Sequence, residues 1–377
     1  MLPLPAGTDF GIYTLLDTLG HGGFAFVYLA RDKQLGRRVC IKEHAPQDIC
    51  RRDAESGEIV PLPGLERAFA GSLADFRQEA EVLAALHHPQ VPAIHEIFEA
   101  GGTAYVVTDY AEGAALPQWL AESPERRRQL PFLLESALRI LQSLHREGVL
   151  HRDIKPAHLI IDAAGGMRLV DFGAAVPAGA RHAPVFTPPY SPPEQNMQGT
   201  AGAWSDLYSL AASFRSVLLQ EPLQEAMQRL EGDNLHPLAD NVSLRREFPA
   251  PFLQGIDRAL SLLPEERFES AEAWLAALAS GESPKRHKRS LAAALAAALL
   301  AAASLCAYLL YTADANNTAV IEQPQQPETA QQSKQDSMPQ NMQEEDPFMP
   351  TQEEMREHRE RMLRFVDGAP FPDERGR

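Results

Sequence analysis

The fold is decided by residues 144–175, LHREGVLHRDIKPAHLIIDAAGGMRLVDFGAA. The charged run HRDIK at residues 151–155 precedes two short apolar segments, which flank a Gly-Gly turn and predict two strands. The triplet DFG at residues 171–173 follows the second segment. Burial of charged groups next to buried strands costs free energy unless these groups contact cations or phosphates. The pattern therefore indicates a site that binds such charges.

Two upstream segments supply further candidate groups. The Gly cluster in DTLGHGGFAFVYLARD, residues 17–32, lies between alternating apolar segments and predicts a hairpin. Because glycine has no side chain, a phosphate could approach this backbone closely, although such a cluster is more often just a turn. The segment RVCIKEH, residues 38–44, predicts a strand in which Lys42 shares a face with Cys40. A lysine on such a strand is usually solvated.

A helix follows, and it offers Lys42 a partner. The segment LADFRQEAEVLAALHHP, residues 73–89, has helical periodicity, with Phe76, Ala80 and Leu83 near one side. Glu79 falls beside that apolar stripe and needs a partner there, and Lys42 is the candidate.

In this order, the motifs resemble those of the eukaryotic-like Ser/Thr protein kinases, in the bacterial membrane-anchored form. The resemblance covers residues 10–279 and implies an α+β, bilobal protein-kinase fold, with a small β-rich N-lobe and a larger α-helical C-lobe. It implies transfer of the γ-phosphate of ATP to Ser and Thr hydroxyls of cytosolic proteins, with ATP and Mg²⁺, or Mn²⁺, as cofactors. The alternative is a pseudokinase scaffold that binds nucleotide or partners without turnover.

The resemblance also implies the role of each matching charged residue. Lys42 would contact the α- and β-phosphates, and Glu79 would hold it by an ion pair. Asp153 would orient the substrate hydroxyl and accept its proton, while Lys155 would steady the transferring phosphoryl group. Asp171 would bind magnesium.

The resemblance further implies a nucleotide site. Thr108 matches the gatekeeper position, and Asp109 to Ala111 would form the hinge whose backbone bonds adenine. The ATP phosphates would be covered by a loop of nine residues: Leu19, Gly20, His21, Gly22, Gly23, Phe24, Ala25, Phe26 and Val27.

The end of the activation segment and the helix after it also match the family. FTPPYSPPEQ, residues 186–195, provides Thr187, which would contact Asp153, and Glu194 of the APE motif. In WSDLYSLAASF, residues 204–214, Asp206 would bond the backbone of the catalytic loop. Arg267 is the expected ion-pair partner of Glu194.

Four positions depart from the family pattern. Ala25 replaces the third glycine of the phosphate loop, and Pro192 and Ala211 are structural substitutions. His158 stands where the family has the Asn that binds a second magnesium. Imidazole is a poor magnesium ligand but a fair one for manganese, so the resemblance implies an altered metal preference or rate. In the alternative reading, His158 merely braces the loop and one metal suffices.

The C-terminal region changes composition sharply. Residues 290–312 are uncharged and consist mostly of Ala and Leu, and at about 1.5 Å each they would span the roughly 30 Å of a bilayer's hydrocarbon. An Ala-rich soluble helix is the alternative. The preceding basic juxtamembrane segment, residues 280–289, would mark the cytoplasmic side of a single-pass membrane protein. We expect the acidic, Gln- and Pro-rich tail, residues 313–377, to be disordered and extracytoplasmic.

Composition excludes several classes of protein. A formal net charge of −16 over 377 residues argues against nucleic-acid binding, which uses clustered Lys and Arg. The three cysteines have no metal-binding spacing and fit a reducing cytosol. The N-terminal residues lack the features of a secretory signal, so we expect the bulk of the chain on the cytosolic side.

Overall fold

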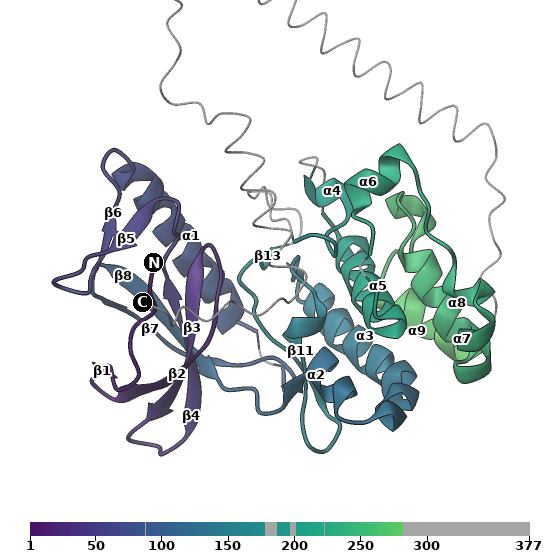
Figure 1. Cartoon of the computed structure of the whole chain (residues 1–377), viewed down its shortest axis with the longest axis horizontal. Coiled ribbons are helices and arrows are strands. Elements are labelled where there is room, and N and C mark those ends of the chain that lie inside the picture. Colours follow the sequence, from purple (N-terminus) through teal and green to yellow (C-terminus); the bar gives the residue numbers. More distant parts are fainter. Residues whose placement is uncertain (87, 178–186, 197–200, 222, 282–377) are drawn as a thin grey trace, which may run out of the picture. The chain divides into compact units, whose positions relative to one another are not determined.

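The computed structural model describes five stretches, all within one compact unit, Met1–Lys288: residues 1–86, 88–177, 187–196, 201–221 and 223–281 (Figure 1). The predicted membrane segment at residues 290–312, the tail at residues 313–377 and most of the basic segment lie outside these stretches. Within the described residues, no helix combines the length and the apolar character needed to cross a membrane.

The N-lobe, residues 1–109, is a six-stranded antiparallel sheet with one long helix (Figure 1). The strand order is β1-β2-β3-β4-β8-β7, and a separate hairpin, β5-β6, precedes the helix α1. The elements are β1 (Asp9–Phe10), β2 (Tyr13–His21), β3 (Ala25–Asp32), β4 (Arg38–His44), β5 (Cys50–Arg52), β6 (Ile59–Pro61), α1 (Glu66–Ala84), β7 (Ile94–Ala100) and β8 (Thr103–Asp109).

The two faces of this sheet carry different sets of side chains, because successive side chains of a strand point to opposite sides. Lys42 pairs in register with Val27 on β3 and Val106 on β8, so these three residues share one face. Ile41 and Tyr28 are likewise paired and lie on the other face, where both are fully buried in the core of the N-lobe. The predicted strand and its orientation are thus confirmed.

A buried charge anchors the segment between β4 and α1. Glu43 is fully buried, and its carboxylate accepts hydrogen bonds of 2.7 Å from the Tyr28 and Tyr105 hydroxyls. Arg52, on the β5-β6 hairpin, donates a third bond of 2.7 Å to the same carboxylate. Because a buried carboxylate is stable only when its oxygens are paired, this cluster fixes the hairpin to the sheet.

The C-lobe, residues 114–281, is mainly helical, and the short strands described in its first part form a three-stranded and a two-stranded sheet (Figure 1). Its strands are β9 (Ala114–Ala115), β10 (Val149–Leu150), β11 (Leu159–Ile161), β12 (Met167–Leu169) and β13 (Val176–Pro177). Its α-helices are α2 (Leu116–Ala121), α3 (Leu130–Arg146), α4 (Pro193–Asn196), α5 (Ala203–Leu219), α6 (Ala226–Glu231), α7 (Val242–Glu247), α8 (Ala250–Ala259) and α9 (Ala271–Ser280). The described residues of the lobe also form the 3-10 turns η1 (Pro124–Gln129), η2 (Pro156–His158), η3 (Leu238–Asp240) and η4 (Pro264–Glu266).

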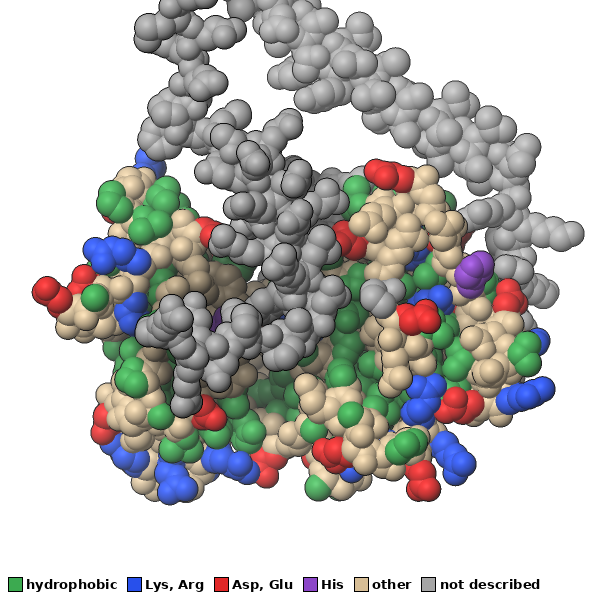
Figure 2. Space-filling view, viewed as in Figure 1, with side chains coloured by type: hydrophobic (Ala, Val, Ile, Leu, Met, Phe, Trp, Pro, Cys, Tyr) green, Lys and Arg blue, Asp and Glu red, His purple; other side chains and the backbone are tan. Residues whose placement is uncertain are grey.

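One apolar cluster holds the C-lobe together. The helix α3 buries a stripe with helical spacing that includes Leu134, Leu138 and Leu141, and it packs against α5 and α9. The predicted bilobal α+β fold is therefore confirmed for the described residues. On the face drawn in Figure 2, basic and acidic side chains are intermixed rather than gathered into one patch.

Candidate active site

The catalytic loop is held in place by a buried carboxylate on α5. Asp206 is fully buried and accepts hydrogen bonds from the backbone N–H groups of His151 (2.9 Å) and Arg152 (2.7 Å). Arg152 has φ = 66°, a left-handed conformation that costs a non-glycine residue about 1–3 kcal/mol. The two bonds stabilise this strained turn, and they confirm the contact expected for Asp206.

The turn directs the Asp153 side chain into the site. Its Oδ2 atom accepts a hydrogen bond of 3.1 Å from Nζ of Lys155. Its Oδ1 atom is buried and has no hydrogen-bond partner among the described residues. Because a buried acceptor without a partner is costly, Oδ1 is the atom in this loop best prepared to accept a proton or hydrogen bond from a ligand.

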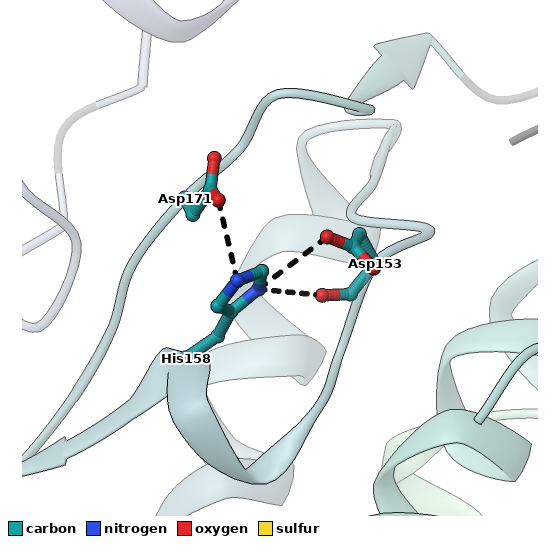
Figure 3. A group of neighbouring side chains, drawn as sticks. All are labelled: Asp153, His158 and Asp171. Atoms are coloured by element: carbon teal, nitrogen blue, oxygen red, sulfur yellow. Dashed lines mark hydrogen bonds and ion pairs between the residues drawn. The ribbon is translucent and has the colours of Figure 1, made fainter. Parts of the chain in front are cut away.

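His158 joins the catalytic loop to Asp171 (Figure 3). Its Nδ1 atom lies 2.7 Å from the carbonyl oxygen of Asp153 and 3.7 Å from Oδ2 of that residue. Its Nε2 atom lies 3.2 Å from Oδ2 of Asp171. One ligand atom from each of the three side chains lies within 4.8 Å of the others, as binding of one cation requires.

The donor set of this group is one imidazole and two carboxylates. Magnesium prefers oxygen ligands, whereas manganese also accepts imidazole, so the set fits either ion and suits manganese better. The sequence predicted Asp171 and His158 as metal ligands but did not add Asp153 to them. The backbone at Asp171 is also left-handed, with φ = 59°.

Lys42 lies nearer to Asp171 than to its expected partner. Its Nζ atom is 3.0 Å from Oδ1 of Asp171 and 3.9 Å from Oε1 of Glu79. The helix α1 positions Glu79 by packing Phe76 against Val106, on the same face of the sheet as Lys42. The expected Lys42–Glu79 ion pair is present, but Asp171 holds the shorter contact.

The charges in this cluster shift one another's pKa. Burial acts to raise the pKa of Asp171, but Lys42 and the hydrogen bond from His158 outweigh it and hold that pKa well below its usual range. Burial raises the pKa of Glu79 to about 7, with Lys42 opposing and Asp171 adding to the shift. Burial acts to lower the pKa of Lys42, but Asp171 and Glu79 raise it above its usual value. Asp171 and Lys42 are therefore ionised near neutral pH, while Glu79 titrates there.

The glycine cluster forms the tip of the hairpin between β2 and β3, as predicted. A Cβ atom at Gly20, Gly22 or Gly23 would meet no atom within 4 Å, so the loop's own packing does not require glycine and leaves open space. One residue of the predicted loop faces elsewhere. The Phe26 side chain is 1% exposed and packs in the N-lobe core with Tyr28, because strand alternation places it opposite Val27.

The predicted hinge begins at Asp109, the last residue of β8. The Thr108 hydroxyl donates to the carbonyl oxygen of Asp109 at 3.2 Å, and the Asp109 N–H donates to the carbonyl of Ala93. The Asp109 carboxylate holds β7 by contacts to the Ala93 N–H and to Nε2 of His95, a role that the sequence did not predict. In the part of the chain that the structure describes, the backbone groups of Ala111 make no hydrogen bond. They are open to a ligand.

Beyond the site, Arg267 forms the expected ion pair with Glu194. Arg267 is 2% exposed, and its guanidinium donates two hydrogen bonds, of 2.7 and 3.0 Å, to the Glu194 carboxylate. The Ser205 hydroxyl donates a third bond to the same group, at 2.8 Å. The contact expected between Thr187 and Asp153 is not seen, since no hydrogen bond joins these two described residues. The Thr187 N–H donates to the Ser191 hydroxyl instead.

Comparison with known proteins agrees with this geometry. The family model described as the protein kinase domain matches residues 13–276. The chain therefore belongs to the protein kinase family. Its relatives include the serine/threonine-protein kinase PknB of Mycobacterium tuberculosis, which is 31% identical over 298 residues, 73% of this chain and 44% of PknB.

A second relative is the serine/threonine-protein kinase PrkC of Bacillus subtilis, 28% identical over 272 residues, 70% of this chain and 39% of PrkC. The chain thus matches less than half the length of these curated relatives. Among solved structures, PpkA-294 in its apo form is similar, with a TM-score of 0.62 and 30% identity over 73% of this chain and 99% of that one. The kinase domain of Mycobacterium tuberculosis PknI shares the fold, with a TM-score of 0.52 and 23% identity over 74% of this chain and 99% of that one.

Proposed function

We propose that this chain is an ATP-dependent protein kinase that transfers the γ-phosphate of ATP to Ser and Thr hydroxyls of other proteins. The observation that supports this most is the buried Oδ1 atom of Asp153, which has no partner among the described residues and lies beside Lys155. A hydroxyl that enters the site could donate a hydrogen bond to this atom, and its proton could pass to the carboxylate.

The neighbouring charges supply positioning and charge balance, which phosphoryl transfer needs more than covalent chemistry. Lys42 and Lys155 carry the positive charge, and Glu79 holds Lys42 from the side of α1. Asp171, His158 and Asp153 would hold a divalent metal ion. When bound, the ion neutralises charge on the phosphate oxygens.

The remaining nucleotide contacts would come from the backbone of the hinge and of the glycine loop. The backbone of Ala111, together with the carbonyl of Asp109, would bond adenine at the hinge. The loop from Leu19 to Val27 would cover the phosphates through its backbone. The buried Phe26 side chain takes no part in this.

The test is transfer of label from γ-labelled ATP to a generic protein substrate by the full chain, with either Mg²⁺ or Mn²⁺, followed by identification of the labelled amino acids. Label on Ser and Thr supports the proposal. Label on Tyr alone would contradict the Ser/Thr assignment. Nucleotide binding without any transfer would establish the pseudokinase alternative.

We also propose that residues 290–312 tether the kinase to a membrane, with the kinase domain on the cytoplasmic side. The support is the uncharged, Ala- and Leu-rich composition of this segment and its basic flank. The full chain should then sediment with membranes and require detergent for release. Recovery of the full chain in the supernatant without detergent would contradict the tether.

A further inference from the structure

The tip of the glycine loop is bonded to the segment that follows β4. The Ala45 N–H donates to the carbonyl of Phe24 at 2.9 Å, and the Gln47 N–H donates to the carbonyl of Gly23 at 2.8 Å. The Gln47 side chain adds a third bond, from Nε2 to the carbonyl of Gly22, at 2.9 Å. Three consecutive carbonyl groups of the loop therefore point toward residues 45–47.

This pattern fixes the direction of the N–H groups. In a planar trans peptide, the carbonyl of one residue and the N–H of the next point in opposite directions. The bonds to the Gly22 and Gly23 carbonyls therefore turn the N–H groups of Gly23 and Phe24 away from residues 45–47. Neither N–H has a hydrogen-bond partner within the described stretches.

Two successive free N–H groups that point the same way make an anion-binding nest, the kind of backbone site that holds phosphates. No atom lies within 4 Å of the position a Cβ would take at Gly22 or Gly23, so there is room for a ligand. The Phe24 side chain is 74% exposed and does not fill this space.

Gln47 is itself held firmly. The carbonyl of Pro46 accepts hydrogen bonds from the N–H groups of Ile49 (3.2 Å) and Cys50 (3.0 Å), which closes a tight turn around Gln47. The Cys50 thiol, 2% exposed in the N-lobe core, donates to the same carbonyl. The turn is thus anchored to the core, and Gln47 extends from it to the loop.

We propose that Gln47 is a positioning residue that orients the Gly23 and Phe24 N–H groups to receive the phosphates of the nucleotide. The inference rests on the proposed function, because it assumes that ATP binds under this loop. Gln47 acts through the backbone of the loop and touches no reacting atom.

The experiment measures the affinity of the full chain for adenosine, ADP and ATP by titration calorimetry. Gln47→Ala removes the bond to Gly22, and we expect ADP and ATP to bind about three- to tenfold more weakly, with adenosine unchanged. Gln47→Glu replaces the donor by a carboxylate that repels phosphates, and we expect at least the same loss. The control is Gln34→Ala, an exposed glutamine in the turn at the opposite end of the β3-β4 hairpin, which should change none of the three affinities.

Unchanged ADP and ATP affinity in both Gln47 variants would overturn the inference. An equal loss of adenosine affinity would overturn it as well, because it would show a general structural effect. The melting temperature of each Gln47 variant shows whether that variant folds. If one of the two variants does not fold, the nucleotide affinities of the other variant test the inference. A wild-type chain that binds none of adenosine, ADP and ATP would contradict the proposed function itself. A wild-type chain that binds them, with an affinity that the Gln47 variants leave unchanged, would contradict only the inference about Gln47.

Discussion

His158 connects Asp171 to the catalytic loop, with Nε2 placed 3.2 Å from Oδ2 of Asp171. A carbonyl oxygen can only accept, so Nδ1 of His158 donates its hydrogen to the carbonyl of Asp153 at 2.7 Å. When a metal ion binds, it would replace the hydrogen that Nε2 donates to Asp171, and Nε2 would then present a lone pair next to a carboxylate oxygen. A cation between these two atoms would satisfy both.

This relationship predicts the metal preference. His158→Asn replaces an imidazole ligand by an amide oxygen, which magnesium prefers, so we expect faster turnover in Mg²⁺ and a several-fold smaller ratio of the Mn²⁺ rate to the Mg²⁺ rate. Steady-state phosphorylation rates over a series of concentrations of each ion measure this ratio. An unchanged ratio would mean that His158 only braces the loop.

Glu79 predicts a pH dependence of nucleotide binding. Burial raises its pKa to about 7, so Glu79 is ionised above that pH and neutral below it. The Lys42–Glu79 ion pair therefore forms as the pH rises through about 7, and we expect ATP affinity to increase over the same range. Titrations between pH 6 and 8 test this, with Glu79→Gln as the control. A Glu79→Gln variant that keeps the same pH dependence would contradict the assignment.

The same group has an opposite effect on stability. Its pKa in the folded state, about 7, lies above the ordinary value of 4.5, so the folded chain binds the proton more tightly than the unfolded chain. The stability that this proton contributes is full below pH 4.5 and is lost as the pH rises through 7. The free energy of unfolding, measured with urea, should decrease from pH 5 to pH 8 in the wild type. The decrease between these two pH values should be smaller in Glu79→Gln. Equal decreases would indicate that Glu79 titrates normally.

The buried Glu194–Arg267 ion pair predicts a large stability effect. Arg267→Met leaves the Glu194 carboxylate buried without its main partner, and we expect the free energy of unfolding to fall by about 3–5 kcal/mol. Arg146→Met is the matched control, because Arg146 forms an exposed pair with Glu272 and its loss should cost less than about 1 kcal/mol. Urea unfolding of both variants gives the comparison, and similar losses would contradict the argument.

The catalytic loop and the DFG triplet could be placed in one site because they lie close together in the sequence. Residues 151–158 and 171–173 flank one small hairpin, β11-β12, so their proximity follows from local structure. The strand with Lys42 was predicted from alternation alone. The helix α1 was predicted to begin near residue 73 but begins at Glu66, because Phe69 in its first turn packs in the N-lobe core.

Other features depend on contacts between distant residues and have no local signal. Glu43 is adjacent to Lys42 in the sequence, and only the folding of the β5-β6 hairpin brings Arg52 to it. Gln47 lies 25 residues from its partner Gly22. The burial of Phe26, by contrast, could have been predicted from the sequence. The strand alternation that placed Lys42 correctly also places Phe26 in the core.

The measurement that tests the central claim most directly is phosphoryl transfer by Asp153→Asn beside the wild-type chain. The substitution keeps the size of the side chain but removes its ability to accept a proton, and Asp153 provides the buried oxygen without a partner. With γ-labelled ATP and Mg²⁺ or Mn²⁺, we expect the wild type to label a protein substrate and the variant to lose at least about 100-fold in rate while it still binds ATP. Transfer by Asp153→Asn at the wild-type rate would contradict the account.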